Sequence, residues 1–139
     1  SKLYYFSTVI VLFIVINIVY ENTRIVEREI IGKSKLWVSG FNKKDYNLIK
    51  SFYTDNSILI AKPFGKFRGK ICINDFWESL MKSGDKCLEY TKINMKIIND
   101  KKVLFNAYWT MKQQEGIINE TWVKESNKWK IQEVYFEVK

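Results

Sequence analysis

The sequence contains no histidine among its 139 residues. Histidine is the usual base at neutral pH and the commonest zinc ligand, so its absence excludes Ser-His-Asp and Cys-His catalysis and most zinc sites. There are two cysteines, Cys72 and Cys87, and a predicted helix separates them. We therefore expect two free thiols, and nothing in the sequence predicts a metal site or a cofactor.

Acidic residues are also scarce, with 15 Asp and Glu against 23 Lys and Arg, which gives a formal net charge of +8. Such an excess favours anionic partners, but the lysines are spread along the whole chain, so solubility is the simpler explanation. The hydrophobic share of 47% and the charged share of 27% are those of a folded protein. The length corresponds to one domain.

Charge is absent from residues 3–20, "LYYFSTVIVLFIVINIVY". An 18-residue helix is about 27 Å long, close to the thickness of the hydrocarbon core of a bilayer. We therefore divide the chain into a transmembrane anchor or signal segment, 1–21, and a folded domain, 22–139. The run ends in the bulky residues Ile18, Val19, Tyr20 and Glu21, where a signal peptidase needs small ones, which favours a single-pass anchor over a cleaved signal and a secreted protein. A buried helix of a soluble domain is a third reading, and cations on both sides of the run leave the topology open.

Beyond the anchor the sequence predicts helices first. Apolar residues at helical spacing continue the first helix through 24–41, and a short helix follows "FNKKD", where Asn42 is the expected cap. The segment "SILIAK" predicts a strand that Pro63 ends. Helical spacing returns in "INDFWESLMKSG", with Gly84 as the C-terminal stop.

Strands fill the remainder of the chain. Turn sequences at 99–102, 113–116 and 125–128 separate four runs rich in β-branched and aromatic residues. Short turns between successive strands predict an antiparallel meander. Helices followed by strands predict an α+β fold, in which a curved sheet wraps around the helices and leaves a pocket at its open end.

The order of these segments resembles a known superfamily. "FNKKDYNLIKSFYTDNSILI", the Pro-Phe-Gly turn, "DFWESLMKSG" and "ETWVKESNKWKIQEVYFEV" resemble the SnoaL-like and DUF4440 branch of the nuclear transport factor 2-like (NTF2-like) superfamily. This resemblance implies a cone of N-terminal helices on a curved antiparallel sheet, a pocket between them, and dimerisation through the outer sheet face. It implies no single activity, since the superfamily includes enzymes and catalytically silent members.

The catalytic residues of the ketosteroid isomerase-like members are missing. Their general-base aspartate stands just before the proline that ends the first strand, where this chain has Ala61 and Lys62. Their oxyanion-stabilising tyrosine corresponds to a position near Trp37. Many members also carry a His-Asp pair in the last strand, where Glu133 and Val134 stand here.

One acid remains as a catalytic candidate. Period-two spacing places Glu133 on the same face of the last strand as Trp129 and Ile131, which predicts an acid or base inside an apolar pocket. The alternative is an ion pair with a lysine at the sheet edge. The residues expected to line the pocket, unless they serve only as core, are Trp37, Phe41, Phe64, Trp77, Tyr108, Trp109 and Tyr135.

The segment "KPFGKFRGK", 62–70, interleaves phenylalanines with cations. We interpret it first as a pocket rim or surface turn, next as a contact with anionic lipid headgroups or a partner, and last as a nucleic-acid site.

Taken together, these features predict a membrane-anchored, non-catalytic domain that binds a small apolar ligand or serves as a subunit of a homodimer or larger complex. The alternatives are an isomerase or lyase that uses Glu133, and a secreted protein released by signal cleavage.

Overall fold

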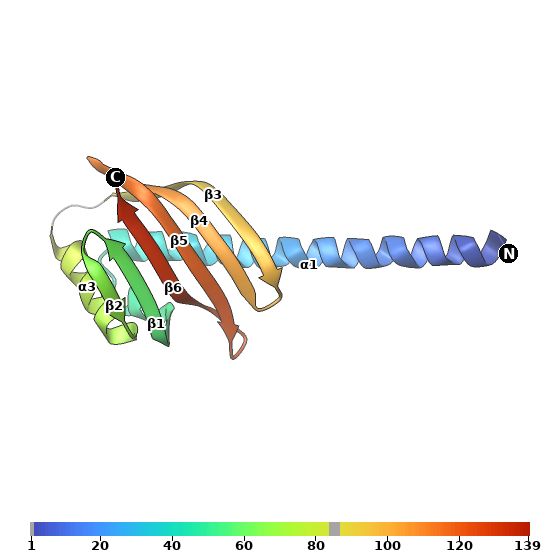
Figure 1. Ribbon diagram of the computed structural model, residues 1–139, viewed down its shortest axis with the longest axis horizontal. Coiled ribbons are helices and arrows are strands. Elements are labelled where there is room, and N and C mark those ends of the chain that lie inside the picture. Colours follow the sequence, from blue (N-terminus) through green and yellow to red (C-terminus); the bar gives the residue numbers. More distant parts are fainter. Residues whose placement is uncertain (1, 84–86) are drawn as a thin grey trace.

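The computed structural model describes residues 2–83 and 87–139, which form three helices and one six-stranded sheet (Figure 1). This confirms the predicted α+β class. The helices are α1 (Lys2–Asn42), α2 (Tyr46–Ser51) and α3 (Lys70–Lys82), and the strands are β1 (Tyr53–Lys62), β2 (Gly65–Arg68), β3 (Leu88–Asn99), β4 (Lys102–Met111), β5 (Gln114–Glu125) and β6 (Lys128–Val138).

The sheet has the strand order β2-β1-β6-β5-β4-β3. Strands β3 to β6 form the predicted antiparallel meander, and β1 joins it in parallel beside β6. The segment 62–70 contains more than the turn that the sequence suggested, because β2 pairs with β1 and closes a hairpin around Pro63.

Helix α1 is continuous from the apolar run into the domain. Residues 3–20 are all exposed, and this half of the helix projects away from the sheet (Figure 1). Its length and composition are those of a membrane span or a signal sequence. The other half packs on the inner face of the sheet through Ile30, Ser34, Trp37 and Phe41, which are all buried. One continuous helix therefore has an exposed apolar half and a half that packs in the core of the domain.

The start of α2 differs from the sequence prediction. The cap of α2 is Asp45, whose Oδ1 accepts a hydrogen bond from the Leu48 amide at 3.2 Å. Asn42 instead binds the start of β3, where its side chain accepts from the Leu88 amide and donates to the Leu88 carbonyl, at 2.8 and 3.0 Å. Gly84, the expected stop of α3, lies outside the described residues.

Candidate functional site

Aromatic rings fill the space between the helices and the inner face of the sheet. The Trp37 ring stacks on Phe41 at a centroid distance of 5.4 Å and meets the Trp77 ring edge-on at 5.2 Å. The Trp37 indole donates a hydrogen bond to the hydroxyl of Tyr53 at 3.1 Å, deep in the core. These contacts fix the rings in one arrangement.

The centre of this core contains a carboxyl group, that of Glu120. Its side chain is 4% exposed and points to the inner face, with Phe105 and Val134 as its neighbours on β4 and β6. The Trp122 indole donates a hydrogen bond to Glu120 Oε1 at 3.2 Å, and this is its one partner among the described residues. Burial raises the pKa of Glu120 to about 7, although the Trp122 hydrogen bond opposes the shift.

Two tyrosines lie near this carboxyl group, Tyr53, which is buried, and Tyr90, which is half-buried. Burial, and then the charge of Glu120, raise the pKa values of Tyr53 and Tyr90 well above their ordinary value. Both hydroxyls therefore stay protonated. The Tyr90 hydroxyl is buried without a hydrogen-bond partner among residues 2–83 and 87–139.

The cavity beside this cluster is small, at about 20 Å³, which is room for about one water molecule. Four of the seven residues predicted to line a pocket do line it, namely Trp37, Phe41, Trp77 and Trp109. The aromatic side chains thus act chiefly as core, and this cavity has no room for a substrate of several heavy atoms.

The other three predicted pocket residues lie elsewhere. Phe64 is at the β1–β2 turn, 51% exposed, with its ring stacked at 6.2 Å on the ring of Phe136. Tyr108 is 43% exposed, and Tyr135 points to the outer face of the sheet beside Lys62, whose Nζ lies 5.5 Å from its ring centroid. These three residues do not join the interior cluster.

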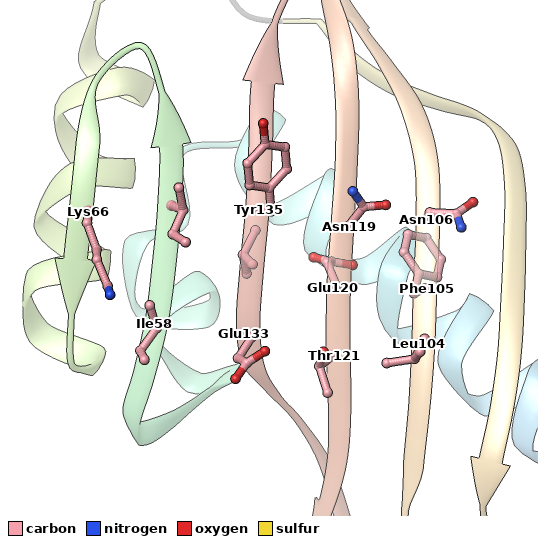
Figure 2. A pocket seen from close by; sticks show the side chains of 12 residues that line it. Ile58, Lys66, Leu104, Phe105, Asn106, Asn119, Glu120, Thr121, Glu133 and Tyr135 are labelled. Atoms are coloured by element: carbon pink, nitrogen blue, oxygen red, sulfur yellow. The ribbon is translucent and has the colours of Figure 1, made fainter.

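Glu133 also lies on the outer face, exposed to solvent, so the expectation that it points into the pocket is wrong (Figure 2). The cause is a β-bulge in β6. Thr121 pairs with Glu133, but the next residue of β5, Trp122, pairs with Ile131, which leaves Gln132 as an extra residue. The bulge shifts the alternation, so Val134 and Phe136 are buried in place of Glu133 and Tyr135.

Sequence reasoning missed Glu120, although a signal for it was present. In "GIINETWV" the even-numbered residues Gly116, Ile118 and Trp122 share one face with Glu120, and β5 has no bulge between them. The same period-two argument that failed on β6 would have found the buried acid on β5.

The outer face of the sheet is hollowed by a groove of about 520 Å³ (Figure 2). Two transverse rows of side chains line it, Ile60, Tyr135, Asn119 and Asn106 in one row and Ile58, Glu133, Thr121 and Leu104 in the next. All three helices pack on the opposite face (Figure 1), so this mixed polar and apolar surface is open.

The described part of the chain offers few side chains for binding a metal or for redox chemistry. No group of three or more His, Cys, Asp or Glu side chains there could hold a metal ion. Cys72 and Cys87 are both exposed and free, as the sequence predicted.

Comparison of the sequence with models of known protein families and with curated proteins gives no match. Solved structures do match. An NTF2-like protein of unknown function from Pseudomonas putida KT2440 is 17% identical, with a TM-score of 0.72, over 82% of this chain and 87% of that one.

Two further matches carry names of enzymes. The hexachlorocyclohexane dehydrochlorinase LinA-type3 from Novosphingobium barchaimii LL02 has a TM-score of 0.71 and 12% identity, over 84% of this chain and 88% of that one. A putative scytalone dehydratase from Novosphingobium aromaticivorans DSM 12444 has a TM-score of 0.71 and 10% identity, over 86% and 88%. At these identities the likeness concerns the fold alone, and the fold that this chain shares with them is the NTF2-like cone of helices on a curved sheet.

Proposed function

We propose that this chain is a membrane-anchored, non-catalytic assembly subunit of the SnoaL-like and DUF4440 kind. In this proposal residues 3–20 of α1 cross the membrane once, and the NTF2-like domain presents its outer sheet face to a second copy or to another subunit. The observation that carries the proposal is a contrast of volumes, about 20 Å³ for the cavity in the aromatic core against about 520 Å³ for the groove on the outer face.

Catalysis is disfavoured by the same contrast. A buried acid with a raised pKa beside two tyrosines is what an isomerase or lyase needs, and Glu120 fits that description better than Glu133. However, a substrate must reach the acid, and rings occupy the space where it would bind. The same aromatic rings would also exclude a small apolar ligand from this space.

The outer face has the composition of an interface. Its groove combines aliphatic side chains with amides and a tyrosine, as protein–protein interfaces that form between folded subunits do, and it also contains the charged side chains of Lys66 and Glu133. Asn119 lies in the middle of the groove and is exposed (Figure 2). A partner would therefore cover it.

The proposed assembly role is tested by placing a charged side chain in the groove of the outer face. We expect the full chain in mild detergent to behave as a dimer or higher assembly at micromolar concentration, measured by light scattering. Asn119→Arg should weaken association by at least about 3 kcal/mol, because a partner would bury an unpaired cation. The matched control is Asn47→Arg on the exposed side of α2, which should leave the mass unchanged. A wild-type chain that stays monomeric, with and without extracts of its membrane, would exclude the assembly role.

A further inference from the structure

Cations gather in a groove between α1 and the β5–β6 turn, outside the surfaces described above. The groove has a volume of about 460 Å³, and its walls include Arg28 and Lys33 from α1 and Lys124 and Lys128 from β5 and β6. Lys70 and Lys130 extend this basic cluster at one side, where the charges of Lys33, Lys70 and Lys128 act on Lys130.

Few acids balance the basic cluster. Glu29 and Glu125 are its neighbouring carboxylates, and Glu29 Oε2 already accepts a hydrogen bond from the Trp129 indole at 2.6 Å. The salt bridge found within residues 2–83 and 87–139 joins Lys82 to Glu78, in α3 and away from this groove. No cation of the basic cluster is therefore ion-paired in the described part of the chain.

Two side chains of the cluster lie over aromatic rings. The Lys124 Nζ lies 5.6 Å from the centroid of the Trp129 ring, and the Lys33 Nζ lies 5.9 Å from that of Phe52. Partial burial, followed by the repulsion of the neighbouring lysines, lowers the pKa of Lys130. An anion bound in the groove would relieve this repulsion.

The basic groove lies close to the point on α1 where the apolar run ends. Helix residues Val19 and Thr23 flank Ile97 and Asp100, so the β3–β4 turn lies where the apolar run ends. The β5–β6 turn points toward the same end of the sheet, the end from which the apolar half of α1 leaves (Figure 1). The segment 62–65 lies at the opposite end, away from the apolar run.

Helix geometry then gives the distance to the bilayer. The Arg28 Cα lies about 12 Å along the helix axis from that of Tyr20, the last residue of the apolar run. The headgroup layer is about 5 to 8 Å thick on each side of the hydrocarbon core, and long basic side chains extend toward it. The cations of the groove can thus reach lipid phosphates.

We propose that the basic groove between α1 and the β5–β6 turn binds the phosphate groups of anionic phospholipids on the membrane surface next to the anchor. This inference rests on the proposed anchoring. Each cation near an anionic surface adds a modest attraction, and several cations in one groove add to it together. The consequence is a domain held down on the bilayer and not free to tilt.

The experiment measures lysine acetylation on the full chain in nanodiscs, by mass spectrometry. One set of discs contains phosphatidylcholine alone, and the other contains about one-third phosphatidylglycerol. We expect acetylation of Lys124 and Lys128 to be about fivefold slower in the anionic discs, because a phosphate stabilises the protonated amine. Lys62 and Lys66, at the far end of the domain, should react equally in both.

A matched pair of variants separates a built groove from a general surface potential. Arg28→Gln removes one cation of the groove and should abolish most of the protection of Lys124 and Lys128, while Lys62→Gln, with the same change in charge, should not. Protection that survives Arg28→Gln unchanged would overturn the proposal. So would equal protection by inorganic phosphate in neutral discs, which would indicate a site for free phosphate.

Failure of the anchor is a different result. Chains that remain in neutral discs but show no lipid dependence overturn headgroup binding and leave the anchoring intact. Chains that are not retained in neutral discs refute the anchoring. Salt-sensitive protection of Lys124 and Lys128 on phosphatidylglycerol vesicles would then still support the headgroup site.

Discussion

At the scale of single residues, the buried carboxyl of Glu120 links stability to pH. In the unfolded chain its pKa is near 4.5, and in the folded protein it is about 7. Between these values the unfolded chain has lost its proton while the folded protein still holds it, so stability falls as pH rises. The contribution is complete below pH 4.5 and is lost once pH passes about 7, and it amounts to about 3 kcal/mol.

Glu120→Gln should remove this pH dependence. The amide oxygen keeps an acceptor for the Trp122 indole, so we expect a variant that is more stable than the wild type at pH 8 by about 3 kcal/mol or less. Urea unfolding of the full chain in detergent at pH 5 and pH 8, followed by tryptophan fluorescence, measures the difference. Glu133→Gln is the control, since that carboxyl group is exposed on the outer face. A wild type whose stability does not fall over this range would contradict the burial of an ionisable Glu120.

Gly116 is required at another point of the core. A Cβ atom built there would lie 1.8 Å from the Glu137 carbonyl oxygen and 2.8 Å from the Trp109 ring, and the backbone of β6 cannot move aside cheaply. Gly116→Ala should therefore lower the free energy of unfolding by about 2 kcal/mol or more.

Gly32, in the middle of α1, provides the opposite case. A Cβ atom added there would meet no neighbouring atom within 4 Å, so Gly32→Ala should raise the stability by up to about 1 kcal/mol, through helix propensity alone. Denaturation midpoints of the two variants measure both effects. Equal effects of the two substitutions would contradict the tight packing at Gly116.

At the scale of helices and strands, the sequence predicted the order and kind of the elements well. The meander followed from turn residues and β-branched runs, and the class followed from helices preceding strands. The predictions failed where a single residue determines which face of a strand is buried or which element a side chain binds. Gln132 inserts into β6 without any glycine or charge to mark it, and this one insertion moved Glu133 and Tyr135 to the other face. Asn42 matched a cap in type but binds β3, a partner 46 residues away that local rules cannot see.

The candidate site was less predictable than the fold. Trp37, Phe41, Trp77 and Trp109, which the sequence predicted to line a pocket, meet in one interior, because large rings on the apolar faces of predicted elements converge there. Whether the interior is open or filled depends on how the rings interlock, and no pattern in the sequence encodes that.

The apolar half of α1 yields a prediction about membrane attachment. The full chain should remain in the membrane fraction after an alkaline carbonate wash, whereas a shortened chain that begins at Asn22 should be released, because it keeps the core residues of α1 and loses the apolar run. The intact mass of the retained protein then distinguishes an uncleaved anchor from a processed signal sequence. Complete release of the full chain would refute the anchor.

At the scale of the whole molecule, the two faces of the sheet differ in what covers them. The inner face packs against α1, α2 and α3. It contains the carboxyl group of Glu120, the side chains of Tyr53 and Tyr90, and the small cavity. The outer face contains the open groove. Substitutions at Asn106, Asn119 or Thr121 can therefore change the surface of the outer face without disturbing the core, since these side chains point away from it.

The continuity of α1 also limits how the molecule can move. No break separates the apolar half of the helix from the half that packs into the core, so in the proposed anchored state the domain and the apolar half of α1 would turn together as one rigid body. Figure 1 views the sheet face-on with α1 running across the picture, so the outer face would stand upright when α1 is normal to the bilayer. Two anchored copies would then meet by lateral diffusion, with the outer sheet face of each already perpendicular to the bilayer. Confinement to a plane raises their effective concentration, and a contact too weak to persist in solution becomes sufficient between neighbours in the membrane.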